Sequence, residues 1–164
     1  MRLVVTDANI FFDLIKIEAL GLFFQLDLEF HTSAIVMDEC RAADRALLES
    51  YVEKGILRVA SYTEQEMHDV EHTGTRKSLS PADRSVLYTA KQLSGIVLTS
   101  DRAMRLECEA MSIECHGSLW CVKEIHQHGK CDARHALDLL RALQRVNLWL
   151  PKQELEELMR EIGG

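Results

Sequence analysis

Residues 1–15 read MRLVVTDANIFFDLI, and the fold depends on the pattern in this stretch. A short apolar run, Leu3–Thr6, leads into Asp7, and apolar residues then recur at helical spacing over Ala8–Ile17. A buried parallel strand that feeds directly into a helix gives this pattern. An aspartate at the junction suits a helix N-cap, but a carboxylate at the end of a strand suits a ligand site equally well.

The same alternation of strand and helix continues along the chain. Short apolar runs predict buried strands at Leu3–Thr6, Leu28–His31, Ile56–Ala60, Ile96–Thr99 and Ser112–Cys115. Longer amphipathic segments predict helices at Ala8–Ile17, Ala34–Lys54, Glu64–His72, Pro81–Leu93 and Arg102–Met111. Strands that alternate with helices indicate an α/β fold with a mostly parallel central sheet.

The chain from Trp120 onward predicts helices only. Over Pro151–Ile162 one apolar stripe at helical spacing is formed by Leu155, Leu158, Met159 and Ile162. We expect this stripe to pack on the body of the protein or on a second subunit.

Length and composition indicate one soluble domain. The chain has 164 residues, of which 47% are hydrophobic and 27% charged, and no apolar run is long enough to span a membrane. Without a signal-peptide pattern, and with five cysteines that form no C-x-x-C pair, we expect a cytoplasmic protein with reduced thiols. The net charge of −7 argues against broad, nonspecific nucleic-acid binding, although a local site remains compatible with it.

Two aspartates directly follow predicted strands. Asp7 comes directly after the predicted strand Leu3–Thr6, and Asp101 comes directly after the run IVLTS at 96–100. In open parallel sheets, ligands bind at the carboxyl ends of the strands, so both side chains are expected at one edge.

A third acid begins a predicted helix. In LSPADRSVLYTA, Ser80 is a candidate N-cap, Pro81 the first helical residue and Asp83 the third. Asp83 shares a helical stripe with Leu87 and Ala90, so we expect it to point toward the sheet.

The fourth candidate is one of two adjacent acids, Asp38 and Glu39. The predicted helix over Ala34–Lys54 has a buried stripe at ~100° per residue. That stripe consists of Val36, Cys40, Ala43 and Leu47. Glu39 lies about 70° from its centre and Asp38 nearly opposite, which makes Glu39 the inward candidate.

Each acid alone has an ordinary explanation. Asp83 in a first helical turn is a stabilising charge against the helix dipole, and Asp7 and Asp101 can act as helix caps. Four inward-leaning acids at one edge would repel one another strongly without a cation between them. Hard oxygen ligands of this kind suit Mg²⁺ or Mn²⁺.

The ordered motifs resemble those of the PIN domain family, which includes VapC-type toxins and other metal-dependent ribonucleases. They are VVTDANIFFDL, IVMDEC, LSPADRSVLYTAKQLSGIVLTSDRAMR and HGSLWCVKEI, and they span about residues 1–126. The resemblance implies a three-layer α/β/α sandwich around the parallel sheet and, often, a homodimer. It divides the chain into a nuclease domain, 1–126, and a helical C-terminal extension, 127–164, that is longer than expected for the shortest toxins.

The resemblance also implies roles for individual residues. The family's metal-binding and catalytic acids fall on Asp7, Glu39, Asp83 and Asp101. Asn9, and Thr99 or Ser100, occupy positions that orient the acids through hydrogen bonds. The expected activity is hydrolysis of RNA phosphodiester bonds with Mg²⁺ or Mn²⁺, by one ion or two.

Arg84, Arg102 and Arg105 lie beside these acids and are candidates for contacts with RNA phosphates, the alternative being an ordinary solvated helix face. His68 and His72 have a zinc-compatible spacing, but a solvated helix pair is favoured because the glutamate of H-E-x-x-H is missing. The Cys/His-rich stretch 115–131 matches no standard zinc motif. Trp120 and Trp149 are interpreted as core or interface anchors rather than base-stacking platforms.

Rival families fit less well. Haloacid-dehalogenase-type phosphotransferases need D-x-D after the first strand, and the triplet here is Asp7-Ala8-Asn9. The stronger alternative is a catalytically silent PIN-like module that binds or scaffolds a partner. If the protein is the toxin of a toxin–antitoxin pair, an antitoxin protein is a further expected partner.

Overall fold

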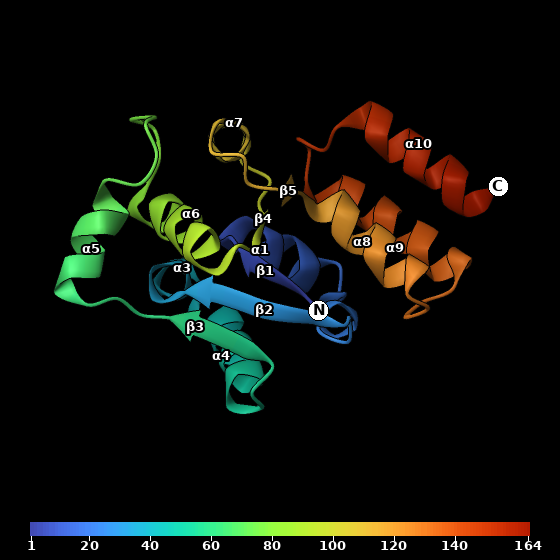
Figure 1. The fold of residues 1–164 in the computed structure, drawn as a ribbon. Coiled ribbons are helices and arrows are strands. Elements are labelled where there is room, and N and C mark those ends of the chain that lie inside the picture. The colour runs from blue at the N-terminus through green and yellow to red at the C-terminus, as the bar shows by residue number, and fades with distance from the viewer.

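A five-stranded parallel sheet forms the centre of the computed structural model, which describes residues 1–164 (Figure 1). The strand order is β3-β2-β1-β4-β5, and every neighbouring pair is parallel. The strands are β1 (Arg2–Thr6), β2 (Leu28–Ser33), β3 (Leu57–Ala60), β4 (Ile96–Leu98) and β5 (Cys115–His116). The α/β fold class with a parallel sheet is confirmed.

Ten helices surround the sheet. They are α1 (Ala8–Lys16), α2 (Leu20–Phe23), α3 (Ala34–Glu39), α4 (Ala42–Glu53), α5 (Glu64–Glu71), α6 (Pro81–Leu93), α7 (Arg102–Ala110), α8 (Ser118–Gln127), α9 (Ala133–Val146) and α10 (Lys152–Gly163). Helix α6 packs on β1, β2 and β4 on one face, and α1 and α4 lie on the other, as right-handed crossovers require. The three-layer sandwich is confirmed.

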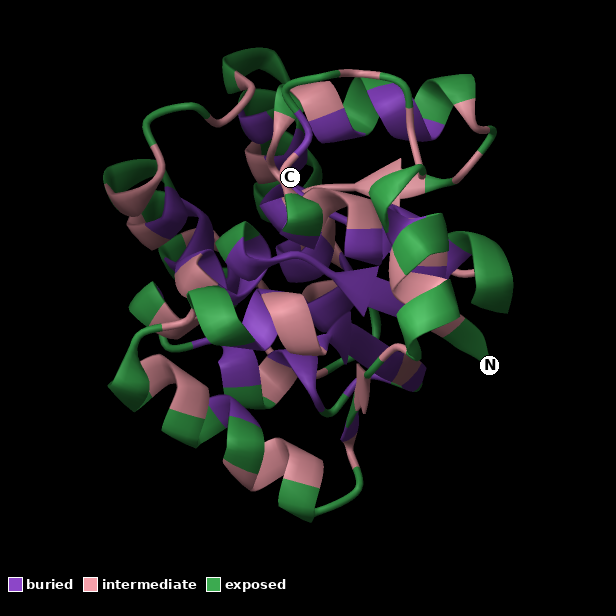
Figure 2. Cartoon of the chain, turned by 90° about the vertical axis from the view of Figure 1, so that its left-hand side faces the viewer, coloured by how far each residue is buried: buried purple, intermediate pink, exposed green.

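The C-terminal helices share the core of the rest of the chain. One cluster of 37 buried residues joins the sheet, α1 and α6 to apolar side chains of α8, α9 and α10. Figure 2 shows the buried residues along the sheet and on the inner faces of the helices, with exposed residues outside. Leu155 and Leu158 of α10 are buried within this chain, so the apolar stripe of the tail packs on the body of the protein.

Three local expectations differ from the structure. The segment predicted as one helix, Ala34–Lys54, forms α3 and α4, because Cys40 and Arg41 adopt extended backbone between them. Ala43 and Leu47 are consequently exposed and do not continue the stripe of Val36.

The other two differences are one short helix that was not predicted and the start of one strand. The short helix α2 was not predicted, because four residues give no helical period to read. Strand β5 begins at Cys115 rather than Ser112, because Ser112 has a positive φ of 56° and the Ile113 amide donates to the Cys108 carbonyl to end α7. No helix is long and apolar enough to cross a membrane.

Candidate metal centre

Asp7 lies between β1 and α1 and holds two hydrogen bonds. Its Oδ1 accepts from the amide of Ala8 at 2.8 Å, and its Oδ2 accepts from the Thr99 hydroxyl at 2.9 Å. Thr99 follows β4, which pairs with β1, and the Asp7 amide donates to the Leu98 carbonyl. The pairing of β1 with β4 therefore places Asp7 and Thr99 together, with Asp7 only 3% exposed.

Thr99 also connects Asp7 to Asp101. The Asp101 amide donates to Thr99 Oγ1 at 3.1 Å, while Asp101 Oδ1 caps α7 by accepting from the Met104 amide at 2.9 Å. A single hydroxyl thus links the first and last acids of the set. Neighbouring Ser100 has a buried Oγ without a hydrogen-bond partner, and Asn9 is exposed.

Asp83 and Ser80 form a capping box at the start of α6. The Ser80 amide donates to Asp83 Oδ2 at 2.8 Å, and Ser80 Oγ accepts from the Asp83 amide at 3.0 Å. Pro81 occupies the first turn, as predicted. Asp83 Oδ1 and Asp101 Oδ2 accept no hydrogen bond from the protein, so both oxygens remain free for another ligand.

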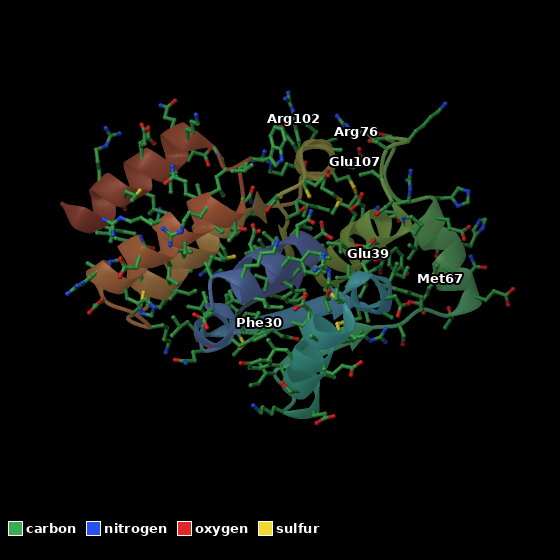
Figure 3. All side chains as sticks on the ribbon, turned by 180° about the vertical axis from the view of Figure 1, so that it is seen from behind. Phe30, Glu39, Met67, Arg76, Arg102 and Glu107 are labelled. Carbon is green, nitrogen blue, oxygen red and sulfur yellow. The ribbon has the colours of Figure 1, made fainter.

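Glu39 ends α3 (Figure 3), and α3 packs on α6, the helix that carries Asp83. Ser33 caps α3 through the Val36 amide at 3.0 Å, and its hydroxyl also bonds to Ser85 of α6 at 2.7 Å. Asp38, in contrast, pairs with Arg45 at 3.0 Å on the exposed side. Glu39 is therefore the last residue of a short helix, where the backbone becomes extended, and it does not belong to the long buried stripe that the sequence predicted.

The four acids influence one another electrostatically. Burial raises the pKa of Asp7 to about 6, and the negative charges of Asp83 and Glu39 add to this rise against the hydrogen bonds from Thr99 and Ala8. The pKa of Glu39 is raised by burial and then by Asp83, and that of Asp83 by burial and by Asp101. The carboxylates therefore lie near enough to disfavour one another's charge.

The donor chemistry suits a divalent cation, although the side chains are not drawn together as a closed cage. No three His, Cys, Asp or Glu side chains form a metal-binding group. Instead, one carboxylate oxygen of each aspartate accepts a hydrogen bond from a backbone amide at the start of a helix. The second oxygens of Asp83 and Asp101 accept no hydrogen bond from the protein. Mutually repelling carboxylates with free oxygens fit Mg²⁺ or Mn²⁺.

The three candidate arginines differ in their surroundings. The Arg84 guanidinium donates to the carbonyls of Thr73, Gly74 and Arg76, so it holds the loop before α6 in place. Arg102 extends outward from the start of α7 (Figure 3). Arg102 and Arg105 line a groove of about 760 Å³ that also contains Asn9 and Asp101.

Sequence reasoning missed three buried acids: Asp13, Glu107 and Glu124, the last of which pairs with Arg2. Asp13, 7% exposed, accepts from the hydroxyl of Ser118 at 2.7 Å and from Asn147 Nδ2 at 2.9 Å. Glu107, 1% exposed, accepts from Thr75 and from Arg76, whose Nη1 lies 2.7 Å away (Figure 3). For Asp13 the sequence does hold a signal of burial, because this acid lies within the apolar helical stripe that contains Ile10 and Leu14.

The histidines and tryptophans noted in the sequence differ in how far they are packed against the protein. His68 and His72 are exposed neighbours with ring centroids 4.4 Å apart. His116 stacks on Trp120 at 4.7 Å, and Cys121 is completely buried. Trp149 is not a core anchor, because 93% of it is exposed in the single chain, and its expected role as an interface anchor stays a prediction.

Comparison with known proteins agrees with this architecture. A family model described as a PIN domain (DUF3368) matches residues 3–164, which includes α9 and α10. A search of curated proteins finds no match. The family match covers nearly the entire chain, and the parallel sheet bears acids at its carboxyl edge. The chain therefore belongs to the PIN domain family.

Proposed function

We propose that this protein is a ribonuclease that hydrolyses RNA phosphodiester bonds with Mg²⁺ or Mn²⁺ held by Asp7, Glu39, Asp83 and Asp101. PIN domains are generally nucleases that use divalent metal ions. The observation that carries the proposal is the linkage among these acids: Thr99 bonds to both Asp7 and Asp101, and the pKa of Asp7 is raised in part by the charges of Asp83 and Glu39.

The chain's own groups have separate tasks in this reaction. When bound, the cation supplies a Lewis acid that activates water and stabilises charge on the phosphoryl group. Thr99 orients Asp7 by donating to Oδ2, and the helix amides fix the remaining orientation of Asp7 and Asp101. Arg102 and Arg105 bind phosphate oxygens along the groove. Water adds to phosphorus and releases a proton to solvent, one P–O bond breaks, and the departing oxygen takes a proton from solvent, which leaves a phosphate monoester and a free hydroxyl.

A cleavage assay with matched variants tests this function. We expect the wild type to cleave single-stranded RNA with Mn²⁺ and to stop when EDTA is added. Asp7→Asn and Asp101→Asn should lose at least about 100-fold in rate, because losing one ligand weakens or misplaces the ion. Glu39→Gln should be impaired while Asp38→Asn is not, since Asp38 faces Arg45 on the outside. Full activity in both aspartate variants would contradict the assignment.

A silent binding module is the second candidate function. The observation that favours it is that no three acidic, histidine or cysteine side chains form a metal-binding group. RNA binding without any Mn²⁺-dependent cleavage would establish this alternative.

We propose further that this ribonuclease is the toxin of a toxin–antitoxin pair. The expected antitoxin would bind this chain and suppress its cleavage of RNA. Purification of the protein expressed with the reading frame that neighbours it tests this role. A stable inhibitory complex supports it, and an uninhibited enzyme opposes it.

A further inference from the structure

The loop between α9 and α10 exposes two large apolar side chains. Leu148 is 84% exposed and Trp149 is 93% exposed. A tryptophan is rarely left this exposed, because its burial would contribute several kcal/mol in a core or interface. The fold therefore gives no reason for Trp149 to occupy this place.

The loop is nevertheless held in one position. Asn147 Nδ2 donates to the buried carboxylate of Asp13 at 2.9 Å, and Asn147 Oδ1 accepts from the Trp149 amide at 3.0 Å. Asp13 is itself fixed by the Ser118 hydroxyl. One asparagine thus ties the backbone of Trp149 to α1 and α8, which lowers the entropy that a ligand would have to remove.

Trp149 lines the same groove as Asp101. This groove, of about 760 Å³, is lined by Asn9 and Asp101 as well as by Leu148 and Trp149. Its cationic side chains are Lys16, Arg102 and Arg105. Its acidic side chains are Asp101 and the buried Asp13, which accepts from Ser118 and Asn147. Cations therefore outnumber acids in this groove, although the whole chain has a net charge of −7. Cations beside an exposed aromatic ring are the combination that binds single-stranded nucleic acid.

From these contacts we propose that Trp149 is a stacking platform for a base of single-stranded RNA, with Lys16, Arg102 and Arg105 binding the phosphates between that base and the acids. The proposal rests on the ribonuclease function and specifies the strand that enters the site. An unpaired base has a free face for the indole, whereas a base inside a duplex does not. A protein partner is less suited to the groove, because three cations and two asparagines would have to be desolvated.

Equilibrium binding in EDTA isolates this subsite from catalysis. The probe is a fluorescein-labelled RNA of 12 nucleotides, followed by anisotropy, together with a series that carries one abasic position each. Trp149→Ala should raise the Kd about 10-fold, and Trp149→Phe should restore most of the affinity, because any aromatic face can stack. Leu47→Ala is the control, since Leu47 is an exposed leucine on α4, outside the groove.

The abasic series identifies the base itself. At one position, loss of the base should weaken wild-type binding by about the factor that Trp149→Ala causes, yet leave the variant unaffected. With Mn²⁺, Trp149→Ala should raise KM and change kcat little. Wild-type affinity in Trp149→Ala would overturn the proposal. Lowered affinity that is not coupled to any abasic position would also overturn it, and a changed oligomeric mass would then place Trp149 in an interface between protein chains. Coupled binding without cleavage would contradict only the ribonuclease function.

Discussion

Asp7→Asn tests whether Asp7 is a ligand as well as a helix cap, because the variant keeps an oxygen for the Ala8 amide but loses the buried charge that a cation would bind. In the native protein the pKa of Asp7 is about 6, against an ordinary value of 3.8. Between those values the folded chain holds a proton that the unfolded chain has released, so the free energy of unfolding falls as pH rises through this window. At about 1.4 kcal/mol per pH unit, the ionised Asp7 costs roughly 3 kcal/mol above pH 7.

Asparagine removes this cost and keeps the capping oxygen for the Ala8 amide. Its amide group must donate to Thr99 where Asp7 Oδ2 accepted, a change that costs about 1 kcal/mol. In EDTA at pH 8 we therefore expect Asp7→Asn to be about 1–2 kcal/mol more stable than the wild type. The advantage should vanish near pH 4, where Asp7 is protonated in the native state.

Mn²⁺ should reverse the order of the two proteins. A ligand that binds only the native state contributes RT ln(1 + [L]/Kd), about 2.7 kcal/mol at 100 times Kd. Because Asp7→Asn weakens the site, its gain from the same Mn²⁺ concentration should be smaller.

Urea unfolding at pH 4 and pH 8, with EDTA or Mn²⁺, measures all of these terms, and Asp38→Asn serves as the exposed control. A variant that is no more stable than the wild type in EDTA at pH 8, yet keeps the full Mn²⁺ gain, would show that Asp7 is only a cap.

Three further predictions concern the surroundings of the site. Glu107→Ala should cost about 2–3 kcal/mol in urea unfolding, because Thr75 and Arg76 lose a buried acceptor. Burial opposes ionisation of Glu107, but these hydrogen bonds lower its pKa, so its contribution should be present above about pH 4.5 and fall as the solution is acidified; a pH-independent difference from Glu107→Ala would contradict this. Arg84→Ala should lower stability by about 1–2 kcal/mol in thermal melts, whereas Arg102→Ala should leave the melt unchanged and raise KM for RNA. A homodimer is expected by light scattering at micromolar concentration; monomer alone would count against it.

The elements with strong end signals were the ones that sequence could place. Helix α6 has the predicted bounds, Pro81–Leu93, because Ser80, Pro81 and Asp83 supply a cap, a fixed φ and a capping box within four residues. The junction of β1 and α1 was equally clear, since an apolar run, an acid and a helical period meet at Asp7. Local chemistry decides such boundaries, so a single chain is sufficient to read them.

The contacts that escaped prediction join residues far apart in the chain. Asp13 meets Ser118 and Asn147 across 105 and 134 residues, and no local pattern encodes such a pair. Arg84 was a candidate either for contact with RNA phosphates or for a solvated helix face, and the structure shows its guanidinium donating to carbonyls of the loop before α6. The break at Cys40 is similar, because helical periodicity continues through it in the sequence but not in the backbone.

Cap and ligand need not be exclusive roles for the acids at this sheet edge. A parallel sheet with crossover helices directs helix N-termini toward the carboxyl ends of its strands, and their amides attract carboxylates to that edge. Asp101 and Asp83 each give one oxygen to a helix terminus and retain the other. The helix amides thus offset part of the repulsion among acids that would otherwise oppose folding without a cation. The interactions that make Asp7, Asp83 and Asp101 good caps therefore also fix these three carboxylates at the sheet edge where we propose that the cation binds.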